Sequence, residues 1–284
     1  MQIKDFDKKL KTPIVLALGY FESVHLGHRR VIAECVKLSA QLNCKSAVFT
    51  FTGDFKGLPV FTFQERADKI KKLNPDYLIC AEFDKIKDMS GGEFVGRLTE
   101  NFNIKAVVCG RDFRYGAGAK SSVGDLKKVF QTKIIEDCIY AGEKVSTSLI
   151  KEQLAAGMIE KANHILGENY AVTGSVKEGR QFGRAVGFPT ANIQIEQDKL
   201  RLKAGVYAIS AIIQNKEYKG IANYGTRPTF DGKDELLETH LIDFDGNVYG
   251  KDMTVMFYKF IRPIKKFKSK DELIAQIKED ISGL

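Results

Sequence analysis

The pattern of apolar residues changes once along this chain, near residue 167, and the change limits what its 284 residues can fold into. Before it, short apolar runs alternate with segments whose apolar residues recur at helical spacing. After it, strand-like runs follow one another until a helical pattern closes the chain. Strand–helix alternation is typical of a parallel sheet with helices on both faces, and successive strands are typical of an antiparallel barrel. We therefore expect an α/β domain over residues 1–160 and a barrel domain with a terminal helix over residues 161–284.

The periodicity also places the individual elements. In the first part, strands are expected at residues 14–18, 47–51, 77–80, 106–109 and 133–135, and helices around 31–42, 67–73, 94–98, 148–154 and 160–166. In the second part, strands are expected at 170–176, 205–213, 218–223, 238–242 and 252–260. The final helix has Ser269 as a plausible N-cap and Glu272 at the position that completes a capping box.

A glycine-rich segment, residues 179–192 with the sequence GRQFGRAVGFPTAN, stands out after the change of pattern. Glycines let backbone N–H groups approach a ligand closely, and such amides with arginines form anion-binding sites. The Thr190 hydroxyl and the Asn192 amide oxygen could bind a magnesium ion. A glycine-rich hairpin with surface arginines explains the composition equally well.

A second segment, residues 19–28 with the sequence GYFESVHLGH, follows the first expected strand and opens the first helix. It holds His25 and His28, two of the four histidines, at a spacing that places both on one helix face. A helix N-terminus attracts anions, and two imidazole donors there could clamp a polyphosphate. The alternatives are surface histidines or an incomplete metal pair. The carboxyl end of a parallel strand, where such sheets bind ligands, favours a ligand site.

Both segments resemble known enzyme signatures. Residues 179–192 resemble the signature of riboflavin kinases, in which the Pro-Thr-Ala-Asn element binds the magnesium and phosphates of the nucleotide. Residues 19–28 resemble the His-x-Gly-His element of nucleotidylyltransferases and, more narrowly, the FMN adenylyltransferase module of bacterial bifunctional riboflavin kinase/FAD synthetases. The resemblance implies a Rossmann-like nucleotidylyltransferase domain followed by a riboflavin kinase barrel.

Four further segments extend this resemblance. Residues 108–116 are similar to the family's Gly-x-Asp-Phe-Arg-Phe-Gly loop, and residues 145–151 to its Ser-Ser-x-x-Ile-Arg element. In the second part, residues 221–230 match Asn-x-Gly-x-Arg-Pro-Thr-Phe, and residues 237–244 match the strand with the catalytic glutamate. The resemblance then implies a full set of site residues. The expected catalytic residues are Glu238, His25 and His28; the expected ATP- and phosphate-binding residues are Gly19, Phe21, Gly27, Ser146, Ser148, Lys151, Gly179, Gly183, Arg184, Gly187, Thr190 and Asn192; the expected flavin-binding residues are Asp112, Phe113, Arg227 and Arg262; and the expected metal ligands are Thr190 and Asn192.

Glu238 is the candidate general base, taking the proton from the ribityl hydroxyl of riboflavin. An outward carboxylate on an edge strand is the alternative for this residue. An arginine in a loop before proline is likewise the alternative for Arg227.

Three residues depart from the family pattern. Glu22 and Ser23 stand where the family has Asp-Gly, and glycine is the residue that readily accepts a positive φ. Lys151 stands where the family has arginine, and lysine lacks the bidentate fork that arginine offers to phosphate. These departures leave open a chain that phosphorylates riboflavin and has an impaired or retired adenylyltransferase domain.

The resemblance implies two successive reactions. ATP phosphorylates riboflavin to FMN, and a second ATP adenylylates FMN to FAD with release of pyrophosphate, with Mg²⁺ at both sites. Besides the kinase-only alternative, a flavin- or RNA-binding regulator stays open, because six of the twelve residues 259–270 are basic. We expect that run to be a solvated face beside the last helix.

The composition indicates which partners the protein has and in which cellular compartment it works. The net charge of +8 suits an anionic ligand such as a nucleotide. The five cysteines form no Cys-x-x-Cys pair, so no zinc or redox motif is indicated, and their odd number fits a reducing cytoplasm. The N-terminal residues lack the apolar core of a signal peptide, and no apolar run is long enough to cross a membrane. We expect small-molecule partners, no nucleic acid and no membrane; the oligomeric state stays open.

Overall fold

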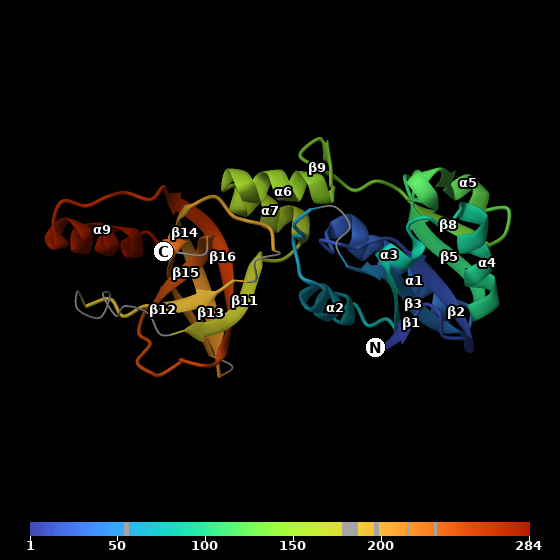
Figure 1. The fold of residues 1–284 in the computed structure, drawn as a ribbon, viewed down its shortest axis with the longest axis horizontal. Coiled ribbons are helices and arrows are strands. Elements are labelled where there is room, and N and C mark those ends of the chain that lie inside the picture. Colours follow the sequence, from blue (N-terminus) through green and yellow to red (C-terminus); the bar gives the residue numbers. More distant parts are fainter. Residues whose placement is uncertain (54–56, 178–186, 196–198, 215, 230–231) are drawn as a thin grey trace. The chain divides into compact units, whose positions relative to one another are not determined.

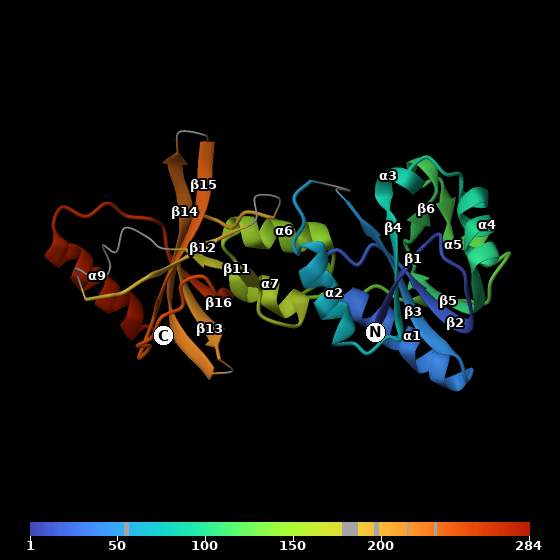
Figure 2. The same cartoon turned by 60° about the horizontal axis from the view of Figure 1, so that its bottom comes forward.

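A computed structural model describes the chain except for residues 54–56, 178–186, 196–198, 215 and 230–231, and within residues 226–236 it describes no side chains. The chain divides into two compact units, Met1–Thr147 and Ser148–Leu284. Each unit is described by itself (Figures 1 and 2). The expected domain ranges, 1–160 and 161–284, stay a prediction. Within the described residues, no helix combines the length and the apolar character needed to cross a membrane.

The N-terminal unit is built on a six-stranded parallel sheet with the strand order β1-β4-β3-β2-β5-β8. The five expected strands are all present, as β2, β3, β4, β5 and β8. The edge strand β1 was not expected, because its short, largely exposed sequence has no apolar run. The strands are β1 (Gln2–Asp5), β2 (Leu10–Leu18), β3 (Lys45–Thr52), β4 (Tyr77–Glu82), β5 (Phe102–Gly110) and β8 (Thr132–Ile135).

Helices cover both faces of this sheet, as expected. Along β2, Leu16 and Leu18 belong to one apolar core, which also contains Phe94 and Leu98 of α4. Their neighbours Val15 and Ala17 belong to the other core, with residues of α1 and α2. This alternation is the period of two of a strand that is buried on both faces. The helices are α1 (Leu26–Gln41), α2 (Phe63–Lys71), α3 (Phe83–Ile86), α4 (Gly91–Asn101) and α5 (Val123–Leu126).

Two small hairpins complete the N-terminal unit. One pairs β6 (Arg114–Tyr115) with β7 (Ser121–Ser122), and the other pairs β9 (Ile139–Tyr140) with β10 (Glu143–Lys144). The second hairpin follows β8 and leads into α6 (Thr147–Ala156). It therefore lies at the carboxyl side of the sheet, where ligands bind in folds of this class.

The C-terminal unit contains a closed antiparallel barrel with the order β11-β12-β15-β14-β13-β16. Tyr207 and Phe257 pack edge to face in its core, with ring centroids 5.3 Å apart. The five expected strands are present, and the unexpected sixth, β12, begins in the second half of the Pro-Thr-Ala-Asn segment and extends two residues past it. The strands are β11 (Ala171–Lys177), β12 (Ala191–Gln194), β13 (Gly205–Ile213), β14 (Lys216–Thr229), β15 (Gly232–Leu241) and β16 (Asp252–Arg262).

Two further helices belong to the barrel unit, α7 (Ile159–Leu166) and α9 (Lys270–Ser282). On α7, the Asn163 side chain donates to the Phe257 carbonyl of β16 at 2.8 Å. Ser269 is the N-cap of α9, as expected, and its hydroxyl accepts from the Glu272 N–H. The Glu272 carboxylate accepts instead from the Lys268 N–H, so only half of the capping box forms.

Candidate functional sites

A strained turn links β2 to α1 and sets the position of both N-terminal histidines. Phe21 and Val24 have φ values of 52° and 45°, in the left-handed region, and both side chains are buried. Such a φ is costly for a β-branched residue, so surrounding packing has to hold Val24 in place. Ser23 is not among the residues with positive φ. The position where the family has glycine therefore needs no glycine in this chain.

The two departures from the family pattern brace this turn. The carboxylate of the buried Glu22 accepts a hydrogen bond from the Val60 N–H at 3.2 Å. The buried Ser23 hydroxyl lies 2.9 Å from the Thr147 hydroxyl. Both side chains thus point into the protein and tie the turn to distant parts of the chain.

The two histidines stack face to face at the start of α1. His25 is the N-cap, and its Nδ1 accepts from the His28 N–H at 3.1 Å. The ring centroids are 3.6 Å apart with an interplanar angle of 10°. A Cβ at position 27 would lie 3.0 Å from the His25 ring, so Gly27 lets the ring lie against the helix end.

Burial keeps both imidazoles uncharged. It lowers the pKa of His25 from 6.5 to about 4. It also lowers the pKa of His28 well below 6.5, and the charges of His25 and Arg66 lower it further. The rings are therefore neutral hydrogen-bonding groups at neutral pH. The His28 Nδ1 atom is buried and has no hydrogen-bond partner within the described residues, so a bound ligand could supply one.

A cavity of about 270 Å³ opens beside the histidines. Its walls come from the segments after β2, β5 and β8 and from both ends of the β9–β10 hairpin. Eight of the sequence-predicted site residues line it together: Gly19, Phe21, His25, Gly27, His28, Asp112, Phe113 and Ser146. Ser148 and Lys151 lie on α6, past the end of this unit, and are not among the lining residues.

Two basic residues near this site were missed from the sequence. Lys144 lines the cavity, and its ion pair with Asp112 lowers the pKa of that carboxyl. Arg66 of α2 is buried; its guanidinium donates to the Phe51 carbonyl and lies 4.9 Å from the centroid of the Tyr20 ring. The spacing of Phe63, Arg66 and Ile70 puts Arg66 on the buried face of its helix, a signal the sequence did contain.

In the barrel, strand pairing brings the candidate catalytic glutamate beside the candidate metal ligand. Glu238 on β15 is the direct partner of Asn192 on β12 and of Asn223 on β14. Asn192 is in turn opposite Lys177 on β11. Side chains of directly opposed residues lie on the same face of a sheet, so these four share one row. Neither Asn223 nor Lys177 was among the predicted site residues; Asn223 opens the motif matched within residues 221–230, whereas only the pairing register indicates Lys177.

The Pro-Thr-Ala-Asn segment is fixed to the same strand. His240 Nδ1 lies 2.9 Å from the Pro189 carbonyl oxygen, and its ring packs edge-on against Phe188. The Thr239 hydroxyl donates to the Ala191 carbonyl at 3.2 Å. Gly187 precedes the segment with a φ of 84°, a conformation that favours glycine.

The donor atoms of this segment fit a magnesium ion. The Asn192 Oδ1 atom is buried and has no hydrogen-bond partner within the described residues. Thr190, two residues earlier, is half-buried and adds a hydroxyl oxygen. Magnesium prefers oxygen ligands, and an orphaned buried oxygen is costly unless something binds it.

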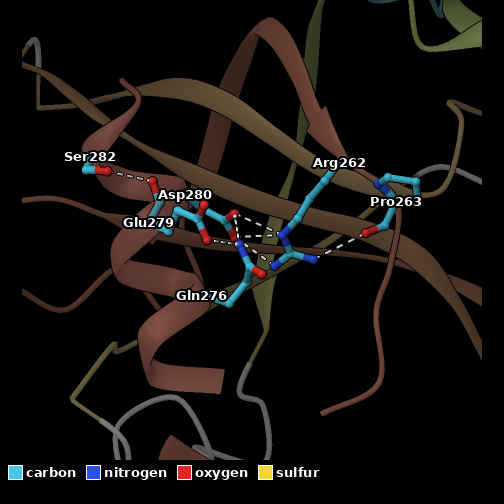
Figure 3. Close-up of polar contacts among 6 residues, drawn as sticks. All are labelled: Arg262, Pro263, Gln276, Glu279, Asp280 and Ser282. Atoms are coloured by element: carbon cyan, nitrogen blue, oxygen red, sulfur yellow. Dashed lines mark hydrogen bonds and ion pairs between the residues drawn. The ribbon is translucent and has the colours of Figure 1, made fainter. Parts of the chain in front are cut away.

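Among the remaining predicted residues of the barrel unit, the structure describes the side chain of Arg262 alone. Gly179, Gly183 and Arg184 lie outside the described residues, and Arg227 lies on β14 with its side chain outside them. The Arg262 guanidinium makes three hydrogen bonds to the buried Asp280 of α9, between 2.7 and 3.1 Å (Figure 3). Arg262 thus fastens α9 to β16, and a flavin contact by this residue stays a prediction.

Comparisons with known proteins cover both units. Residues 7–149 match the family model described as FAD synthetase, and residues 166–284 match the one described as riboflavin kinase. Curated relatives named bifunctional riboflavin kinase/FMN adenylyltransferase include those of Listeria monocytogenes, 32% identical over 94% of this chain and 90% of the relative, and Haemophilus influenzae, 34% identical over 94% and 91%. A crystal structure titled macrolide-efflux protein from Streptococcus pneumoniae is 26% identical and covers 99% of this chain and 98% of its own, with a TM-score of 0.92.

Proposed function

The chain belongs to the family of bifunctional riboflavin kinase/FMN adenylyltransferases, and we propose how its residues divide the two reactions. As a transferase, it phosphorylates riboflavin to FMN with ATP and then joins AMP from a second ATP to FMN, giving FAD and pyrophosphate. The observation that carries this assignment is the match of two separate family models to the two parts of the chain. The cavity beside the histidines and the polar row of the barrel are the proposed locations of the two reactions.

In the kinase step, the proposed base is Glu238. It would accept the proton of the ribityl hydroxyl while that oxygen attacks the γ-phosphorus of ATP and ADP leaves. Thr190 and Asn192 would hold Mg²⁺, which neutralises charge on the phosphates when bound. The direct pairing of Asn192 with Glu238 supports this arrangement, since it puts the metal ligand and the base in adjacent strands.

In the adenylyl transfer step, the phosphate of FMN attacks the α-phosphorus of ATP and pyrophosphate leaves. His25 and His28 would donate hydrogen bonds to the phosphate oxygens as charge shifts onto them. Donors already fixed by stacking and capping need no reorganisation during the reaction. The orphaned nitrogen of His28 supports a ligand at this place.

The kinase-only alternative is disfavoured. Glu22 and Ser23, two of the three departures that motivated it, serve as braces of the turn, and neither requires a conformation that its side chain resists. The curated relatives are named for both activities. Lys151 keeps a positive charge where the family has arginine, so a weaker phosphate contact is the expected cost.

We further propose small-molecule partners alone and a reducing cytoplasm as the location. All five cysteines are free thiols, which is consistent with such a compartment. In the basic run 259–270, Arg262 pairs with the buried Asp280 and Lys265 pairs with Glu272, while the other four lysines are exposed to solvent. This arrangement supports the interpretation of the run as a solvated face beside α9.

The test is chromatographic analysis of products over time from riboflavin, ATP and Mg²⁺. FMN should appear first and FAD later, and supplied FMN should yield FAD without a lag. FMN that never becomes FAD would restore the kinase-only alternative. Absence of both products would overturn the assignment.

A further inference from the structure

Lys144 closes the β9–β10 hairpin at the wall of the N-terminal cavity. The chain just before this hairpin, Asp137 and Cys138, lines the cavity, and so does the chain just after it, from Val145 to Thr147. Lys144 is therefore anchored at both sides, and its ammonium group lies at the cavity wall.

The ammonium group of Lys144 bridges two carboxylates. Its Nζ lies 2.9 Å from Oδ2 of Asp112, in the loop after β5, and 2.9 Å from Oδ1 of Asp137, in the segment after β8. The Lys144 and Asp112 side chains are 41% and 71% exposed. Ion pairs this exposed contribute little to stability, so the ammonium group can leave them at small cost.

The wall of the cavity carries more negative than positive side chains, so a nucleotide that binds there needs a cation close to its phosphates. Of the described residues that line it, Lys144 alone is a lysine or arginine, while Asp112, Glu136 and Asp137 are acidic. The two histidines are neutral, because burial lowers their pKa. Glu136 already pairs with Arg111. A triphosphate in this cavity would lie near the carboxylates of Asp112 and Asp137, and Lys144 is the cation that pairs with both.

We propose that Lys144 is a phosphate-binding residue of the adenylyl transfer reaction. When ATP binds, its ammonium group exchanges the carboxylates of Asp112 and Asp137 for phosphate oxygens. The inference rests on the proposed function of this cavity and adds a residue that the family signatures did not indicate. It also explains why a neutral histidine pair suffices beside a highly charged substrate.

Steady-state kinetics of FAD formation from supplied FMN test this role. Lys144→Met should raise KM for ATP about tenfold or more, the effect of losing one charge-assisted hydrogen bond. KM for FMN should stay within about twofold, and Lys144→Arg should recover most of the ATP affinity. Riboflavin phosphorylation by the same variant is the internal control, since Lys144 lies in the other unit. An unchanged KM for ATP in Lys144→Met would overturn the proposal.

Asp137→Asn separates phosphate binding from a purely structural bridge. Removing one carboxylate frees Lys144, so KM for ATP should stay equal or fall, and this effect should vanish in the double variant with Lys144→Met. If Asp137→Asn instead raises KM for ATP as much as Lys144→Met does, the bridge only holds the two loops together and the proposal fails.

Different results would refute the function of the cavity and the role of Lys144. A wild-type chain that forms no FAD from FMN and ATP would refute the proposed function of the cavity. A wild-type chain that forms FAD, with Lys144→Met matching it in KM for ATP, would refute the role of Lys144 alone. Thermal melting of each variant identifies misfolding, and a misfolded Lys144→Met leaves Lys144→Arg and Asp137→Asn to decide, because a structural bridge predicts a raised KM in the latter.

Discussion

By our proposal, the cavity of the N-terminal unit and the polar row of the barrel bind the same substrate, ATP, with different atoms. The first offers nitrogen: two stacked, uncharged imidazoles at a helix N-terminus. The second offers oxygen: the buried Asn192 amide beside the Glu238 carboxylate. Nitrogen donors suit a reaction that must stabilise charge on departing pyrophosphate, and oxygen ligands suit one that needs a metal and a base.

The two places also differ in how the chain builds them. The histidines depend on a strained turn, residues 19–25, in which the Glu22 and Ser23 side chains form hydrogen bonds with distant segments of the chain. The barrel residues depend on regular strand pairing and need no strained backbone at Asn192 or Glu238. Local packing therefore holds the residues of the first site in position, while the hydrogen bonds between the barrel strands hold those of the second.

Removing the base of the barrel should have the largest effect. Glu238→Gln keeps the size and removes the proton acceptor, so FMN formation from riboflavin should fall by about 10³-fold. FAD formation from supplied FMN should persist. Both rates come from one chromatographic assay. Equal loss of the two activities would break the comparison, because it would mean that the reactions share a site.

A substitution in the N-terminal unit should have the converse effect on the two activities and tests the histidines. His28→Ala should lower FAD formation by about 10²-fold or more, the cost of a lost transition-state donor, and spare FMN formation. His164→Ala is the matched control, since His164 lies on α7 in the other unit. The comparison sharpens further if His28→Gln, which keeps an N–H donor, recovers part of the rate. A His164→Ala variant with the same defect would contradict the assignment.

Asn192→Ala should slow riboflavin phosphorylation by weakening the binding of Mg²⁺. We expect FMN formation to fall by about tenfold to 10²-fold, with a higher Mg²⁺ concentration at half-maximal rate, because one oxygen ligand is lost. Gln194→Ala, on the same strand with an exposed side chain, is the control. An Asn192→Ala enzyme with a normal Mg²⁺ requirement would remove Asn192 from the metal site.

The last prediction concerns stability and not rate: the free energy of unfolding of the N-terminal unit should depend on pH. The pKa of His25 is about 4 in the folded chain, against 6.5 when unperturbed, so the unfolded chain binds the proton more readily between these values. Its contribution to the free energy of unfolding is therefore complete above pH 6.5 and is lost as the pH falls to about 4. The loss is on the order of 3 kcal/mol.

Hydrogen exchange followed by mass spectrometry can locate this loss. Peptides of residues 1–147 should lose protection between pH 6.5 and 4, after correction for the intrinsic exchange rate. His25→Asn, which preserves an N-cap side chain, should reduce the slope, and the remaining slope is expected from His28, whose pKa is also lowered by burial. An unchanged slope in that variant would show that another group causes it.

The amino-acid pattern was sufficient for the architecture of both units. Runs such as 14–18 and 106–109 are continuously apolar and short, which is typical of a strand covered on both faces, and all ten expected strands are present. The strand β1 was missed because its four residues include only one apolar residue, and β12 was missed because an alternation over four residues is too short to stand out. Pro189 in front of β12 further obscured it.

The sequence motifs identified candidate site residues but did not predict how these residues are arranged in space. The sequence placed His25 and His28 on one helix face, but their stacking and loss of charge depend on burial and on neighbours that include Arg66, from a different helix. Lys144 escaped because its two partners come from other loops. The roles of Glu238 and Asn192 remain predictions, although the strand register now gives them a physical basis.

That register has a consequence for protein engineering. Because side chains alternate between the two faces of a strand, inserting one residue into β15 ahead of Glu238 would shift Glu238 to the register position of Thr239. The carboxylate would then point away from Asn192 even if the barrel still closed. Loop insertions and circular permutation at the barrel ends should be tolerated far better than any change of strand length here.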